Sequence, residues 1–404
     1  MIIALDGPVM PYAWGSRSAL ADLLGRAPSG ASEAELWVGA HPAGPARLFE
    51  PVDQAENLAQ LLAQDPVALL GAELAARYGR LPFLLKILAI EEPLSLQAHP
   101  DAAQARQGFL REEALGLPRG HATRNYRDDQ HKPELLLALS PVEALCGFRP
   151  HAEVLELLAT FGVSQADSPL AEASAAFSLG GGGQQYAALF RSFFSLAPKE
   201  LERAVELVLA RAQGHVSHAP DGVAWVARWL LRLSATYGAD PGLLAVLLLR
   251  LVRLEPGQAI FLPARRLHSY LSGVGVEVMA ASDNVLRGGL TRKHVDIPEL
   301  SAVLDFAPSE PDLIVATDEE RPGVRIFRTP AAEFELWSLA FDAGGAPVAL
   351  PSPSLLLVLE GSIEVSRSTE RVMLSRGGQA FVSWSAEPAR VTGHGRGFVA
   401  TVRQ

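Results

Sequence analysis

Two short segments place polar side chains with metal-binding potential at the edges of apolar runs. The alternation from Leu94 to His99 predicts a strand that carries Ser95, Gln97 and His99 on one face and its apolar residues on the other. Glu134 opens a second apolar run, where an unpaired carboxylate would be costly to bury. Taken separately, each segment is more typical of an ordinary strand whose polar residues face water than of a metal site.

A third segment adds His268 and Tyr270, which have the same strand parity after a tight turn. A single histidine of this kind is more often a hydrogen-bonded core or surface residue than a metal ligand. All three segments together offer one amide oxygen, two imidazole nitrogens and one carboxylate, a donor set that suits zinc and can polarise a substrate oxygen. The spacing alone does not show that these groups meet.

Composition excludes several classes of protein. The chain has 404 residues and a net charge of -10, which argues against binding to a nucleic-acid backbone. The single cysteine, Cys146, predicts a reducing cytoplasmic location and restricts any metal site to nitrogen and oxygen ligands. The N-terminus lacks a secretory signal pattern, and the apolar run 243–254 is short and broken by Arg250 and Arg253, so no membrane span is expected.

The hydrophobic pattern predicts a mainly β protein with a helical insertion. Residues 1–150 show short apolar runs typical of strands, with one helical stretch at 57–78, and residues 151–249 show helical periodicity. The strand pattern resumes at 250. From about residue 313, a second and smaller β-barrel or sandwich is expected, with strands at 354–359, 362–365 and 379–384 separated by glycine-containing turns.

An ordered set of motifs resembles the type I phosphomannose isomerase family over nearly the whole chain. The motifs are Tyr12-Ala-Trp-Gly-Ser16, Glu35-Leu-Trp-Val-Gly-Ala-His-Pro42, Pro82-Phe-Leu-Leu-Lys86, Pro93-Leu-Ser-Leu-Gln-Ala-His-Pro100, His131-Lys-Pro-Glu134, Cys146-Gly-Phe-Arg149, Leu267-His-Ser-Tyr-Leu-Ser-Gly273 and Ser282-Asp-Asn-Val-Leu-Arg-Gly-Gly-Leu290. The sequence departs from the family pattern at Gln130, Arg265 and Arg292, where the family usually has Asn, Gly and Pro.

The resemblance implies a fold and a cofactor. The expected fold has a discontinuous cupin-type catalytic domain (1–150 with 250–312), a helical domain (151–249) and a C-terminal cupin-like β domain (313–404). One zinc ion per chain is expected on Gln97, His99, Glu134 and His268. The implied reaction interconverts mannose 6-phosphate and fructose 6-phosphate in a monomeric enzyme.

Such an aldose–ketose isomerisation moves a proton between neighbouring carbons through a cis-enediol intermediate. The resemblance identifies Arg287 as an active-site arginine, for the enediolate or for the phosphate. Glu277 and Asp283 have equal parity along a presumed strand and are both candidates for the base. Asp283 is our first candidate and Glu277 the second, with Tyr270 as a further catalytic residue. We expect the sugar phosphate to contact Ser95, Lys86, Lys132 and Lys293, although structural or solvated roles fit Lys132 and Lys293 nearly as well.

Two alternatives to this function remain open on sequence grounds. One is another cupin metalloenzyme, acting on a different sugar phosphate or, with iron, as an oxygenase. The other is a noncatalytic sugar-binding cupin, which would not require the complete ligand set together with Arg287.

Overall fold

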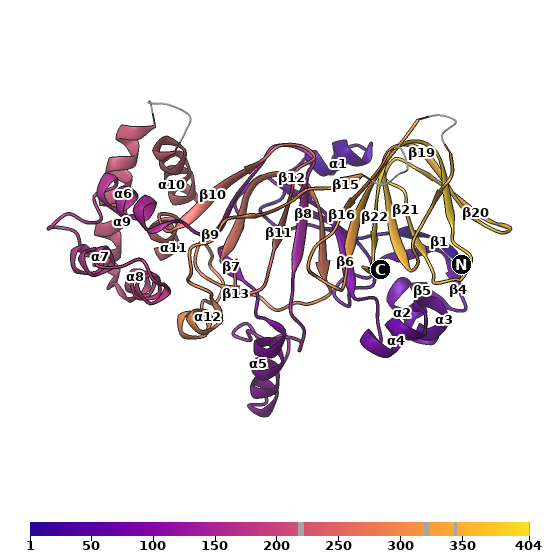
Figure 1. Ribbon diagram of the computed structural model, residues 1–404, viewed down its shortest axis with the longest axis horizontal. Coiled ribbons are helices and arrows are strands. Elements are labelled where there is room, and N and C mark those ends of the chain that lie inside the picture. The colour runs from indigo at the N-terminus through magenta and orange to yellow at the C-terminus, as the bar shows by residue number, and fades with distance from the viewer. Residues whose placement is uncertain (217–221, 319–322, 343–345, 404) are drawn as a thin grey trace.

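Two antiparallel sheets form the body of the molecule, with helices at one end and along its lower side (Figure 1). The computed structural model describes residues 1–216, 222–318, 323–342 and 346–403. Figure 1 shows the helices between residues 151 and 245 gathered at one end and the yellow C-terminal strands at the other, with the sheet of the candidate site between them. The predicted mainly β fold with a helical insertion is confirmed.

The central sheet contains every strand that carries a candidate metal ligand. Its main path runs β14-β11-β8-β12-β6-β3-β2. Four further strands extend it: β7 and β9 pair with the first part of β12, β13 pairs with β7, and β10 pairs with β9. Its strands are β2 (Val9–Met10), β3 (Glu35–Val38), β6 (Phe83–Ile90), β7 (Gln97–Ala98), β8 (Glu134–Ala138), β9 (Val142–Phe148), β10 (Leu249–Leu254), β11 (Ala259–Leu262), β12 (His268–Ala280), β13 (Leu286–Arg287) and β14 (Asp312–Ile314).

The second sheet combines the C-terminal strands with the N-terminus of the chain. Its order is β15-β16-β17-β22-β19-β21-β1-β4-β5, with β18 beside β22 and β20 beside β19. Its strands are β1 (Ile2–Asp6), β4 (Arg47–Val52), β5 (Ala55–Asn57), β15 (Thr317–Asp318), β16 (Val324–Phe327), β17 (Glu335–Phe341), β18 (Val348–Ala349), β19 (Ser354–Arg367), β20 (Glu370–Ser375), β21 (Gln379–Val382) and β22 (Arg390–Thr401).

Helices cover the ends of the sheets. Six of them, α6 to α11, lie within 151–245 and build an apolar core of their own that continues under β9 and β10. The helices are α1 (Ala19–Leu24), α2 (Leu58–Gln64), α3 (Pro66–Leu70), α4 (Ala72–Tyr78), α5 (Ala102–Ala114), α6 (His151–Thr160), α7 (Ala171–Ser178), α8 (Gly183–Ser195), α9 (Pro198–His215), α10 (Val223–Tyr237), α11 (Pro241–Ala245) and α12 (Ile297–Val303). Among the described residues, no helix has the length and apolar character needed to cross a bilayer.

The strands that hold the candidate site are buried on both faces. β6 is buried throughout, and β12 pairs with β6 on one side and with β8 on the other. Gly275 in β12 permits this close approach, because an added Cβ would lie 2.7 Å from a methyl group of Leu136 and 3.0 Å from the carbonyl oxygen of Leu137. A polar group on these strands therefore has either a specific partner or a ligand.

The structure differs from the sequence expectation in three places. The helical stretch predicted at 57–78 is three short helices, because Pro66 starts a new helix and Gly71 (φ 86°) ends it. The glycine-containing turn expected between 359 and 362 is a bulge inside the single strand β19, so the chain does not reverse there. β1, β4 and β5 pair in the C-terminal sheet although they precede residue 150. The domain boundaries themselves stay a prediction.

Candidate metal centre

Three side chains far apart in sequence converge in the interior of the central sheet. His99 follows β7, Glu134 begins β8 and His268 begins β12, and all three are buried. Nε2 of His99 lies 3.2 Å from one carboxylate oxygen of Glu134, and Nε2 of His268 lies 3.5 Å from the other. One ligand atom from each residue falls within 4.8 Å of the other two. This geometry can hold one metal ion.

Backbone carbonyls fix the orientation of both imidazole rings. Nδ1 of His99 lies 2.7 Å from the carbonyl oxygen of Asn284, and Nδ1 of His268 lies 2.9 Å from that of Arg266. A carbonyl oxygen only accepts, so each Nδ1 carries the proton and donates it. Each Nε2 is then left with a lone pair directed at Glu134, which is the arrangement that metal-binding histidines adopt.

The hydrogen bonding of the cluster shows how well a cation would fit it. Nε2 of His99, Nε2 of His268 and Oε2 of Glu134 are buried, and none of the three has a hydrogen-bond partner among the described residues. Burial lowers the pKa of His99 to about 4, so its ring is neutral. Burial alone would raise the pKa of Glu134, but Lys132 and the two histidines outweigh it and hold the pKa well below its usual range. Two imidazole nitrogens and one carboxylate match a divalent cation.

Strand register places Gln97 and Arg287 on the same side of the sheet as His268. Gln97 in β7 lies directly opposite His268 in β12 and, on its other side, opposite Arg287 in β13. Side chains of directly opposed residues emerge on the same face. Gln97 and Arg287 therefore emerge next to each other on the face that His268 occupies. Ser95 lies outside β7, because the strand is shorter than predicted and covers only two residues.

Lys132 and Lys86 both form ion pairs with carboxylates of the protein. Nζ of Lys132 is 2.9 Å from Oε1 of Glu134, so this ammonium already balances a candidate metal ligand. Nζ of Lys86 lies 3.3 Å from Glu35 and 3.4 Å from Glu277. Burial alone would lower the pKa of Lys86, but these carboxylates raise it above its ordinary value. Lys86 is therefore charged in the folded protein.

The register of three strands explains the setting of Lys86. Trp37 in β3 and Glu277 in β12 both lie opposite Lys86 in β6, and the ammonium sits 5.0 Å from the centre of the Trp37 ring. The indole N–H of Trp37 donates to Glu35. Burial and the charge of Glu134 raise the pKa of Glu277 to about 7, although Lys86 opposes this shift. This row of side chains is a buried polar network beside the metal cluster.

The remaining predicted residues occupy different surroundings. Tyr270 is buried, its hydroxyl has no hydrogen-bond partner among the described residues, and burial raises its pKa. Asp283 does not share a strand with Glu277 as its parity suggested, because β12 ends at Ala280. Its side chain is 46% exposed, and its carboxylate lies 3.5 Å from Nε2 of His41. Asp283 is therefore accessible at the edge of the site.

Asn284 is a structural hub that the sequence motifs did not single out. Its buried amide oxygen accepts the backbone N–H groups of Arg127 and Asp128, at 2.7 and 3.2 Å. Its amide nitrogen donates to the backbone carbonyls of Asp128 and Gln130, at 2.7 and 2.9 Å. The carboxylate of Asp128 in turn accepts from the Asp283 backbone N–H at 2.8 Å. These contacts tie the segment before Glu134 to the segment that orients His99.

One departure from the family pattern has a visible backbone cost. Arg265 adopts φ 70°, a left-handed conformation that glycine tolerates better than arginine. Its N–H donates to the carbonyl oxygen of His99 at 2.7 Å, and its Nε donates to that of Val303 at 3.1 Å. The side chain thus makes a contact that glycine cannot, next to a candidate metal ligand.

Comparison with known proteins agrees with this site. Residues 2–151 match the family model described as phosphomannose isomerase type I, catalytic domain. The chain is 36% identical over 397 residues to mannose-6-phosphate isomerase of Escherichia coli K12, and the match covers 97% of each chain. The chain belongs to the type I mannose-6-phosphate isomerase family. The human mannose-6-phosphate isomerase is 32% identical over 406 residues, covering 94% of this chain and 93% of the relative.

Solved structures of this isomerase family share the whole fold. A zinc-bound mannose 6-phosphate isomerase superposes with a TM-score of 0.89 at 34% identity, and a variant of the Salmonella typhimurium enzyme does so with 0.89 at 33%. Both comparisons cover 100% of each chain. The family and the fold inferred from the motifs are therefore confirmed.

Several residues of the site were not found as functional from the sequence. Glu35, Trp37 and His41 belong to one quoted motif. Glu35 and Trp37 have the same parity in one strand and are both buried, and this shared parity was the feature that could have identified them. The side chains of Asp128 and Asn284 accept hydrogen bonds from backbone N–H groups, and such bonds leave no recognisable pattern of residue types in the sequence. A separate cleft of about 490 Å³, lined by Tyr78, His131 and Glu333 among others, includes none of the proposed metal ligands.

Proposed function

We propose that this chain is a zinc-dependent isomerase that interconverts mannose 6-phosphate and fructose 6-phosphate. The observation that carries the proposal is the buried trio of His99, Glu134 and His268 in a member of this enzyme family. Their ligand atoms converge, and Nε2 of both histidines and Oε2 of Glu134 have no hydrogen-bond partner among the described residues. One zinc ion per chain would be held by these residues and by Gln97. When bound, zinc supplies a Lewis acid that stabilises negative charge developing on a substrate oxygen.

The protein's own groups account for the other requirements of the reaction. Arg287 emerges beside Gln97, where its guanidinium can bind an oxyanion of the substrate. Asp283 is our first candidate for the base that moves the proton of the cis-enediol step, because it is accessible and, within the described ranges, forms no ion pair with a lysine or arginine. Glu277 is second, because it is buried and paired with Lys86.

The other predicted contacts are part of the same proposal. Ser95, Lys86, Lys132 and Lys293 would bind the sugar phosphate, and Tyr270 would direct its unpartnered hydroxyl at the substrate. The expected monomeric state, cytoplasmic location and three-domain division stay predictions.

A coupled assay of mannose 6-phosphate conversion tests the proposed function. Chelation should abolish conversion, and added zinc should restore it, because the metal stabilises the negative charge that develops on a substrate oxygen. In deuterium oxide, the product should carry solvent deuterium, and Asp283→Asn should lose this incorporation while retaining zinc. Conversion that survives both chelation and Gln97→Ala would contradict the proposed zinc chemistry.

A further inference from the structure

Three cationic side chains that approach the candidate site from two segments lack a carboxylate partner. Arg287 ends β13 and Lys293 follows it in the same segment, whereas Arg127 comes from the segment that leads to Glu134. Within the part of the chain that the structure describes, none of these three side chains makes an ion pair or a side-chain hydrogen bond. Uncompensated cations at this site indicate a place for an anion.

The backbone of Arg127 is hydrogen-bonded to Asn284, in the segment that carries Arg287 and Lys293, and the three charges act on one another. Burial and then the charge of Arg127 lower the pKa of Arg287. Burial, then Arg287 and then Arg127, lower the pKa of Lys293. Like charges in one place oppose folding unless an anion neutralises them, so the cluster is more stable with a ligand than without one.

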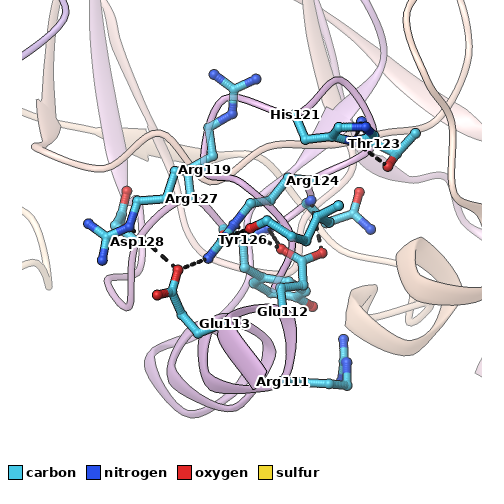
Figure 2. A network of polar contacts seen from close by, with 12 residues as sticks. Arg111, Glu112, Glu113, Arg119, His121, Thr123, Arg124, Tyr126, Arg127 and Asp128 are labelled. Carbon is cyan, nitrogen blue, oxygen red and sulfur yellow. Dashed lines mark hydrogen bonds and ion pairs between the residues drawn. The ribbon is translucent and has the colours of Figure 1, made fainter. Parts of the chain in front are cut away.

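The position of Arg127 is fixed by its backbone. Its N–H donates to the amide oxygen of Asn284 at 2.7 Å. Asn284 precedes Arg287 by three residues in the sequence. Immediately before it, Tyr126 N–H donates to Glu112 at 2.8 Å, and Arg124 Nη2 lies 2.6 Å from Glu113 (Figure 2). Figure 2 shows these contacts joining the segment to α5. The backbone is held on both sides, while the Arg127 side chain itself is exposed and free to bind.

Arg287 connects the cation cluster to the metal centre. Its strand partner is Gln97, which lies opposite His268, so the arginine emerges on the metal side of the sheet. A ligand that reaches both the metal centre and the cation cluster needs an oxygen for the metal at one end and an anionic group for the cations at the other. A sugar phosphate has this composition.

We propose that Arg127 binds the phosphate of the substrate as a third cation beside Arg287 and Lys293. The inference rests on the proposed function and extends it to a residue that the sequence motifs did not identify. A phosphate carries a charge of about -2 and accepts several hydrogen bonds, and the planar fork of arginine matches two of its oxygens.

Steady-state kinetics of Arg127→Ala and Arg127→Lys test this assignment. Because the phosphate does not react, we expect Arg127→Ala to raise KM for mannose 6-phosphate about 10- to 100-fold and to change kcat much less. Inorganic phosphate, used as a competitive inhibitor, should lose affinity in parallel. Arg127→Lys should recover part of both losses, since it keeps the charge and loses the fork.

Matched controls separate this role from a structural one. Arg119→Ala removes an exposed arginine that lies 3.5 Å from Glu113, and it should leave KM and phosphate inhibition unchanged. Zinc content should stay at the wild-type level in all variants. Wild-type KM and phosphate inhibition in Arg127→Ala would overturn the inference, as would a loss confined to kcat. An inactive wild-type protein would instead refute the proposed function.

Discussion

His268→Ala is expected to remove the zinc and to lower kcat/KM by about 10³-fold or more. The variant deletes one of the two imidazole ligands and leaves Gln97, His99 and Glu134 as an incomplete ligand set. Polarisation by a metal contributes several kcal/mol to such a transition state, and each 1.4 kcal/mol corresponds to about a tenfold change in rate. Zinc content by plasma mass spectrometry and the coupled assay measure the two effects.

His121→Ala is the matched control for this substitution. His121 is exposed, its ring contacts Thr123, and it has no contact with the metal cluster. It should retain zinc and full activity. If His268→Ala keeps its zinc and its kcat/KM, then His268 is not a ligand and the metal centre is placed incorrectly.

Lys86→Met is expected to cause the largest loss of stability, about 3–5 kcal/mol at pH 8. Removing one partner of a buried ion pair leaves the other charge without compensation, and here both Glu35 and Glu277 lose their ammonium. Such a loss is a large fraction of the roughly 5–15 kcal/mol by which most domains are stable. Urea unfolding of the wild type and the variant measures the difference.

The pH dependence of this loss follows from the two pKa shifts. The folded-state pKa of Lys86 is raised above its ordinary 10.5, so its contribution is complete below that pH and is lost only at higher pH. The pKa of Glu277 is about 7 and rises further without Lys86. A raised carboxyl pKa opposes folding increasingly as pH rises from its ordinary 4.5. The deficit of Lys86→Met should therefore be large at pH 8 and small at pH 5.

Two comparisons isolate the charge effect of Lys86. Lys199→Met changes an exposed lysine of α9 and should leave the free energy of unfolding unchanged. The double variant Lys86→Met, Glu277→Gln should be more stable than Lys86→Met alone, because one unpaired buried carboxylate is gone. A deficit in Lys86→Met that is equal at pH 5 and pH 8 would indicate lost packing in place of lost charge.

The metal ligands were accessible to sequence reasoning because they violate the hydrophobic pattern. Glu134 begins a strand that is otherwise apolar, His268 is buried at the start of β12, and His99 is buried although its segment alternates. A polar residue in such a place needs a partner, and the set of donors indicates a divalent metal. Local patterns did not show that they meet, since strand register depends on pairing across the sheet.

Other features leave no local signal in the sequence. The pairing of β1 with β21 joins segments from opposite ends of the chain, and nothing in the alternation of β1 specifies that partner. Asp283 was placed on a strand by parity, which is correct for Glu277 but fails once the strand ends at Ala280. The hydrogen bonds of Asn284 go mostly to backbone groups, which every residue type provides. Arg127 is brought to the site by that hub.

Locating the metal directly is the most decisive measurement. An anomalous difference map at the zinc absorption edge, from crystals of the zinc-loaded protein, should show one peak about 2.0–2.2 Å from ligand atoms of Gln97, His99, Glu134 and His268. A map with no peak among these side chains, or with two of them turned into separate cavities, would contradict the account.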